Sequence, residues 1–235
     1  MSKKNLFYTL SLAGVLLFFP VFLSAQKELP VKLGLKIAPN IAWMNPSTKN
    51  YSYNGTRVGA TVGFVSDFYF AERYAFSTGL NFAFLNGRLT YADSLLVPGS
   101  AKMNGTVDRK YNIIYIEIPM MIKMQTKQFG DFSFFGQIGF GTGFRLRATA
   151  NDEYAPDQGN SWTEKNSITE QTTLIRESIL IGLGSEYHLD QSSRIFLGLS
   201  YSNALNNVLH WKNSKSGLNE KSMLNYVELN IGFLF

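Results

Sequence analysis

The chain has 235 residues, of which 45% are apolar and 17% are charged. It is therefore long and hydrophobic enough for one sizeable domain, and a disordered tail or a collagen-like rod is excluded. It contains no cysteine, which excludes disulfide bonds, thiolate metal sites and a cysteine nucleophile. The net charge is +5, but there is no run of five or more basic residues and no nucleic-acid motif, so nucleic acid is not expected as a partner.

The start of the chain has the layout of a secretory signal peptide. A short cationic stretch precedes an apolar run at residues 6–23, and small residues follow it. A membrane anchor is the alternative for an apolar run of this length. Pro20 and the small residues favour cleavage after Ala25. We predict a signal peptide at residues 1–25 and a barrel domain at residues 26–235.

The rest of the sequence alternates between apolar and polar residues with a period of two, which is typical of half-buried strands. No stretch after Ala25 has the roughly 20 consecutive apolar residues of a membrane helix. Eight strands are expected, at residues 31–43, 57–70, 74–86, 111–125, 132–148, 173–189, 193–203 and 225–235.

The connections between these strands are alternately long and short. The long, polar ones are residues 44–56, 90–109, 149–172 and 204–223, and the short ones are residues 71–73, 126–131 and 190–192. A soluble sandwich also alternates in polarity, but short periplasmic turns opposite long extracellular loops are typical of outer-membrane barrels. We predict an all-β fold in the bacterial outer membrane, an eight-stranded antiparallel transmembrane β-barrel whose last strand closes on the first.

Aromatic residues on the apolar face gather near the expected periplasmic strand ends, as in an interfacial girdle. They are Phe68, Phe70, Tyr74, Phe76, Phe132, Phe134, Tyr187, Phe233 and Phe235. The final strand ends on an aromatic with apolar residues at every second position before it, which resembles the signal read by barrel-assembly machinery. A buried last strand of a soluble barrel is the alternative interpretation.

Residues 115–123 read Tyr-Ile-Glu-Ile-Pro-Met-Met-Ile-Lys and resemble a strand of the PorT-type outer-membrane β-barrel family. Leu33-Gly34-Leu35-Lys36 and the stretch at residues 77–81 are also similar to strands of that family. The resemblance covers nearly the whole mature chain. It implies a porin-like barrel in the outer membrane. The family takes its name from a component of the type IX secretion system, but the resemblance implies no specific activity.

Strand parity predicts a polar network inside the barrel. Its members are Lys32, Lys36, Asp67, Glu117, Lys123, Glu186, His188, Arg194 and Glu228. Charges away from water must pair and hydrogen-bond, and eight strands leave little room for solute flow. A satisfied polar plug is the simpler interpretation, and a proton or ion path is the alternative. Glu117 and Lys123 lie roughly 20 Å apart along one strand, so each needs a partner from a neighbouring strand.

Pro119 lies inside that same strand, where a missing N–H is normally tolerated at an edge or a bulge. We predict a local bulge there that fixes the register. A shaped pocket in the lumen is the functional alternative.

Strand lengths place seven cations at a similar height near the outer end. This expected basic rim consists of Arg57, Arg88, Arg109, Lys110, Arg145, Arg147 and Arg176. Arginine suits bidentate contacts with phosphate, so the rim is expected to bind outer-membrane lipids including lipopolysaccharide, with Arg88 and Lys110 on the lipid side. Ordinary solvated charge is the alternative.

Aromatic residues in polar loops are candidate contact points for a protein or a sugar. These candidates are Tyr154 and Trp162 in the acidic loop 149–172 and Trp211 in the last long loop. Asp152, Glu153 and Asp157 in the acidic loop are candidate calcium ligands, but their spacing does not match an EF-hand. No metal and no cofactor are expected.

The two histidines give no catalytic pattern. His188 is expected in the lumen and has no identifiable nucleophile, and His210 lies in the last long loop. Neither belongs to a motif such as H-E-x-x-H. The chain is therefore not expected to be an enzyme.

Three classes of function remain. The leading expectation is a non-enzymatic barrel that is an accessory or structural subunit of an outer-membrane assembly for secretion or biogenesis, with other outer-membrane proteins as partners. A stand-alone surface barrel for adhesion or ligand binding is the second. A narrow conductor or a lipid enzyme is the third.

Overall fold

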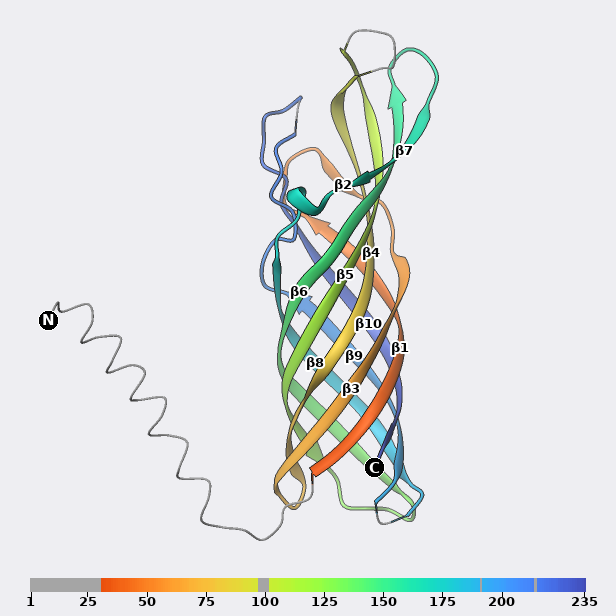
Figure 1. Cartoon of the computed structure of the whole chain (residues 1–235), viewed down its shortest axis with the longest axis vertical. Coiled ribbons are helices and arrows are strands. Elements are labelled where there is room, and N and C mark those ends of the chain that lie inside the picture. Colours follow the sequence, from red (N-terminus) through yellow and green to blue (C-terminus); the bar gives the residue numbers. More distant parts are fainter. Residues whose placement is uncertain (1–30, 97–101, 191, 214) are drawn as a thin grey trace, which may run out of the picture. The chain divides into compact units, whose positions relative to one another are not determined.

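The computed structural model describes residues 31–96, 102–190, 192–213 and 215–235, so the predicted signal peptide lies outside the described residues. The described chain is a closed antiparallel barrel (Figure 1). Its strands are β1 (Val31–Pro46), β3 (Arg57–Ala71), β4 (Tyr74–Leu96), β5 (Lys102–Gln125), β6 (Phe132–Pro156), β8 (Ile175–His188), β9 (Arg194–Ala204) and β10 (Ser222–Leu234). The eight-stranded barrel predicted from the alternation is confirmed. No helix in these ranges is long and apolar enough to cross a membrane.

Closure is made by β1 and β10. The register pairs Gly34 with Leu234, and Leu33 and Phe235 exchange two backbone hydrogen bonds of 3.1 and 2.7 Å. Each strand therefore has a partner on both sides, which satisfies the backbone polar groups that lipid cannot. Val31 and the C-terminus consequently lie at the same end as the short turns.

The outer face is apolar and the inner face carries the polar side chains. All nine residues of the expected aromatic girdle are exposed on the outside, from Tyr187 at 37% to Phe70 and Phe134 at 53%. A second aromatic pair, Trp43 on β1 and Tyr201 on β9, stacks with ring centroids 6.1 Å apart nearer the other end. In water these surfaces would be unfavourable, but in a bilayer they face lipid.

The strands extend further outward than the sequence indicated. β4 and β5 stay paired as far as Leu96 and Lys102, and β6 continues to Pro156. Two short strands add to them, since β2 (Tyr51–Tyr53) pairs with β4 and β7 (Trp162–Ser167) pairs with β6. The long connections predicted at these positions are therefore partly built as sheet, because cross-strand pairing continues beyond the apolar band. We call this sheet the extracellular extension.

Pro119 does not cause the predicted bulge. It is in register with Gly141 on β6, and on the other side the pairing of β4 with β5 is interrupted between Thr78↔Met120 and Asn81↔Glu117. The register is the same before and after this interruption. The missing N–H is therefore accommodated by a local gap in the ladder, and the Thr78 hydroxyl donates a 2.6 Å hydrogen bond to the Pro119 carbonyl.

The bulge lies elsewhere, in β6. Arg145 is opposite Tyr115 and Arg147 is opposite Ile114, so Leu146 has no opposite residue. One extra residue exchanges the inward and outward faces for every side chain that follows it in the strand. Arg147 is therefore exposed on the outside.

Candidate functional site

Four charged side chains form the first layer of the lumen, near the periplasmic end. The Lys123 ammonium contacts Asp67 Oδ2 at 2.6 Å and Glu186 Oε1 at 2.5 Å. Arg194 donates to Glu186 Oε2 at 2.8 Å. Both carboxylates are fully buried, and cross-strand cations compensate their charge. Lys32, another predicted member, donates to the Ser192 carbonyl at 2.6 Å.

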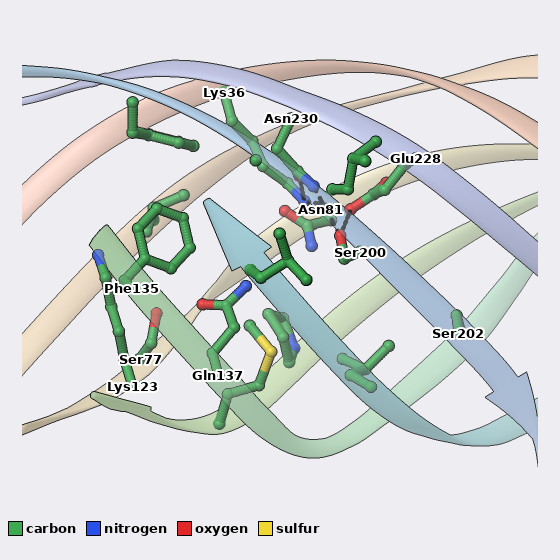
Figure 2. A pocket seen from close by; sticks show the side chains of 18 of the residues that line it. Lys36, Ser77, Asn81, Lys123, Phe135, Gln137, Ser200, Ser202, Glu228 and Asn230 are labelled. Atoms are coloured by element: carbon green, nitrogen blue, oxygen red, sulfur yellow. Dashed lines mark hydrogen bonds and ion pairs between the residues drawn. The ribbon is translucent and has the colours of Figure 1, made fainter. Parts of the chain in front are cut away.

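The second layer is a ring of hydrogen bonds around Lys36. Lys36 Nζ donates to Glu228 Oε1 at 2.8 Å and to Asn230 Oδ1 at 2.9 Å. Asn230 Nδ2 donates to the Ser200 hydroxyl at 2.6 Å, and Ser200 donates back to Glu228 at 3.2 Å. Figure 2 shows these four side chains converging on one side of a cavity, with Asn81 beside them.

This cavity has a volume of about 50 Å³. That is room for roughly three water molecules. Glu228 Oε2 and Asn81 Oδ1 are buried acceptors on its lining without a protein donor. The central lumen therefore has room for a few water molecules, and this space is much smaller than a typical ligand pocket of about 300 Å³ or more.

The third layer is built on Arg176, which the sequence placed in the basic rim. Arg176 is completely buried and donates to Glu117 Oε2 at 3.1 Å, to Ser202 at 2.8 Å and twice to the Leu224 carbonyl. The Tyr226 hydroxyl donates to Glu117 Oε1 at 2.7 Å. The rim expectation is wrong for Arg176, because its side chain turns inward and is the partner that Glu117 needed.

Directly above this layer an apolar cluster fills the lumen. The apolar plug consists of Ala42, Met44, Ala83, Leu85, Leu89, Tyr111, Ile113, Tyr115, Ala148, Ala150, Ile168, Val208, Leu209, Leu224 and Tyr226, each at most 2% exposed. Ile168, Val208 and Leu209 come from segments outside the eight barrel strands and belong to the same buried cluster. The plug therefore closes the extracellular half of the barrel in the way that a core closes a soluble domain.

The remaining rim residues do not form a continuous ring of free cations. Arg109 is buried, and its guanidinium makes a bidentate contact with Asp152, at 2.6 and 2.8 Å. Arg88 pairs with Asp108 on the outside. The rim expectation is therefore wrong for Arg109 and incomplete for Arg88, because neighbouring strands supply carboxylates that strand length alone did not reveal.

Arg57 and Arg145 are held by protein groups. Arg57 donates to the Tyr111 carbonyl and the Asn112 side chain, and Arg145 donates to the carbonyls of Thr169 and Thr172. These contacts anchor the strands to adjacent segments and correct the expectation of a rim.

Two of the seven cations of the predicted basic rim face outward and have no carboxylate within salt-bridge distance among the described residues. Arg147 is exposed, and Lys110 is half-buried opposite Arg88.

The predicted contact aromatics fall into two groups. Tyr154 and Trp162 stack at 5.0 Å between ring centroids, and both pack against Tyr91 and Val107 in the extracellular extension. They are half-buried and hold β7 on β6. Trp211 is 45% exposed and is the one of the three that faces solvent most.

His188 has a neighbour that the sequence did not reveal. Its Nε2 is 2.9 Å from the Ser133 hydroxyl, although no nucleophile was identifiable from spacing. Ser133 is 3% exposed, and Glu186 on the same strand is engaged by Lys123 and Arg194. A serine-histidine pair needs an orienting acid and access for a substrate. Among the described residues no group of three or more His, Asp or Glu has the geometry of a metal site.

A family model agrees with this architecture. The family model described as "Outer membrane protein beta-barrel domain" matches residues 24–210. A search of curated proteins finds no match. Neisserial surface protein A is 11% identical, covering 87% of this chain and 95% of that chain, with a TM-score of 0.47.

Two further structures are similar at the same level. Ail, the attachment invasion locus protein of Yersinia pestis, is 12% identical, covers 87% of this chain and 98% of its own, and has a TM-score of 0.32. OprG from Pseudomonas aeruginosa is 12% identical, with coverages of 87% and 95% and a TM-score of 0.39. The match of the family model over most of the chain shows that this protein belongs to the outer-membrane β-barrel domain family and is a protein of the bacterial outer membrane.

Proposed function

We propose that this protein is a non-enzymatic, non-conducting barrel that uses its extracellular extension to hold a protein partner, as an accessory subunit of an outer-membrane assembly. The lumen supports a structural role for its charges. Every cation–carboxylate pair there is directly bonded, and the apolar plug lies between these layers and the outside. This arrangement opposes a continuous water path, on which a conductor depends.

The single observation that carries the proposal is the edge of the extracellular extension. Within the described residues β7 pairs with β6 alone, so one side of its backbone has no strand partner. Tyr154 and Trp162 hold this edge in place. A fixed strand edge favours a protein partner, because another chain can add to it through main-chain hydrogen bonds.

The second candidate is stand-alone binding of an external ligand. It is favoured by Trp211, which is exposed in residues 204–221 and lies away from β7 in the sequence. An exposed tryptophan is a common anchor in binding surfaces.

One experiment separates the two. Tagged full-length protein is purified from its native outer membrane in mild detergent, and its native mass and bound proteins are determined. The proposal expects a stoichiometric complex that is lost in Trp162→Ala and kept in Trp211→Ala. A lone barrel for the unaltered protein contradicts the accessory role, and loss of the complex in Trp211→Ala alone contradicts the assignment to β7.

A further inference from the structure

Residues 208–213 and 215–222 form the two arms of a hairpin, in which the N–H groups of Val208 and Glu220 donate to the carbonyls of Ser222 and Trp211. Asn213 Nδ2 donates to the Tyr51 hydroxyl at 3.0 Å, and Tyr51 donates to Glu220 Oε1 at 2.6 Å. Asn213 and Glu220 are both 2% exposed. Because side chains alternate along a hairpin, the residues next to them face away from the extracellular extension.

Those outward residues are cationic. Lys212 is directly opposite Asn219, which places Lys221 on the same face as its diagonal neighbour. Diagonal neighbours in such a pair are about 7–8 Å apart at the backbone, a spacing that two lysine side chains can close around one anion. Lys49 joins them, since Thr48 accepts a 2.7 Å hydrogen bond from the Lys221 N–H. We call Lys49, Lys212 and Lys221 the basic face.

The basic face forms no ion pair among the described residues, although Asp93 of β4 accepts a 3.1 Å hydrogen bond from the Lys215 N–H in the same hairpin. Residues 44–56 and 204–221 contain one acidic residue, Glu220, and its carboxylate is buried on the opposite side of the hairpin. By contrast, residues 149–172 contain five acidic residues and one lysine. The extracellular end is therefore electrostatically polarised, and the three exposed lysines form no salt bridge within the described residues.

The height of the basic face identifies the environment that it meets. The stacked Trp43 and Tyr201 are the aromatic anchors of this wall of the barrel. Trp43 is opposite Asn225, and Lys221 lies four residues further out along the same chain. At about 3.3 Å per residue this is roughly 13 Å along the strand, or about 10 Å in height for a strand tilted by about 40°. Flexible lysine side chains facing sideways at that height reach the headgroup layer.

We propose that the basic face is a binding site for the phosphate groups of lipopolysaccharide in the surrounding leaflet. Two lysines from the hairpin and one from the adjoining turn would hold the anion. The site goes beyond the partner-binding role of β7, because it concerns the lipid side of a different segment. It also replaces the basic rim that strand lengths had suggested.

The test uses the full chain folded in detergent micelles and titrated with purified lipopolysaccharide. Lys212→Ser/Lys221→Ser is compared with the matched control Arg73→Ser/Lys127→Ser, which removes two exposed cations from the periplasmic turns. A surface cation near an anionic membrane contributes enough that removing two lowers the affinity on the order of 30-fold. The control is expected to bind like the unaltered protein. The heat-dependent shift of the folded barrel on a gel verifies that all three proteins are folded.

Two further arms identify the ligand. Lipopolysaccharide stripped of its phosphates is expected to bind as weakly to the unaltered protein as intact lipopolysaccharide binds to the variant. Equal binding by the variant and the unaltered protein, or by the stripped lipid, overturns the proposal. Dextran sulfate serves as a soluble competitor, and binding to it that is tighter than to lipopolysaccharide overturns the assignment to the membrane lipid.

Discussion

Arg176 and Glu117 are 59 positions apart in the sequence and meet in the middle of the barrel, with Nη1 and Oε2 3.1 Å apart. Neither side chain is more than 2% exposed. The pair joins β8 to β5 across the lumen, and it separates the polar layers below from the apolar plug above. Its partners, Ser202, Leu224 and Tyr226, come from two further strands, so one guanidinium connects four walls of the barrel.

Glu117→Ala is expected to destabilise the barrel by about 3–5 kcal/mol, because Arg176 then remains as a buried charge without its carboxylate. Urea unfolding in lipid vesicles measures the change in the free energy of unfolding. The double variant Glu117→Leu/Arg176→Met removes both charges and is expected to recover most of the loss. A single variant as stable as the unaltered protein contradicts a paired Arg176.

Two glycines offer a matched comparison. A Cβ at Gly79 would lie 1.9 Å from the Phe64 carbonyl oxygen, whereas a Cβ at Gly136 meets nothing within 4 Å. Gly79→Ala is therefore expected to reduce the folded fraction, and Gly136→Ala is expected to fold like the unaltered protein. The measurement is the fraction of barrel that shows heat-dependent gel migration after refolding. Equal yields for the two variants would show that β3 and β4 separate easily at this point.

The closed lumen predicts that the reconstituted barrel carries no ion current. The apolar plug contains no charged residue, and its members Met44, Leu85 and Ile113 are each at most 1% exposed, so an ion would have to lose its water at that level. Recordings in planar bilayers are expected to show no conductance steps. Discrete steps that persist in independently purified preparations would contradict this reading of the plug.

Asp190 makes the turn between β8 and β9 sensitive to acid. Hydrogen bonds from the backbone N–H groups of Ser192 and Ser193 lower its pKa from the ordinary 3.8 to about 2. Because the folded pKa lies below the unfolded one, the stabilisation is present above about pH 4 and is lost as the pH falls through about 2. Asp190→Asn is expected to unfold at lower urea concentration at pH 7 and to match the unaltered protein near pH 2. A difference between the two proteins that is independent of pH contradicts this assignment.

Periodicity predicts the eight barrel strands because one face of each strand must be apolar for lipid and the other faces the lumen. The same parity identifies the inward position of Lys123 and Glu228. It does not identify which cation meets which carboxylate, since partners such as Arg176 and Glu117 depend on the register between strands that are distant in the sequence. Strand length alone placed Arg176 in the rim, and its buried position follows from packing.

The bulge at Leu146 could not be predicted from the sequence. Residues 144–148 alternate without interruption as Phe-Arg-Leu-Arg-Ala, which predicts that Arg145 and Arg147 share a face. The structure separates them, and the shift also turns Asp152 inward to meet Arg109. Pro119 was the visible irregularity, yet a gap in hydrogen bonding was enough to accommodate it. Whether an irregularity becomes a bulge or a gap in hydrogen bonding depends on small free-energy differences between alternative pairings of neighbouring strands.

The apolar plug also bears on how the strands find their alignment. Around Ile113 and Ile114 the wall of the barrel has apolar side chains both toward lipid and toward the interior. Shifting one strand by a single residue there would replace apolar side chains by other apolar side chains on both faces. Nearer the periplasm the same slip would move Lys123 into lipid. The charged residues near the periplasmic end therefore fix the register between strands. The bulge of β6 lies in the apolar region, where a change of register costs the least free energy.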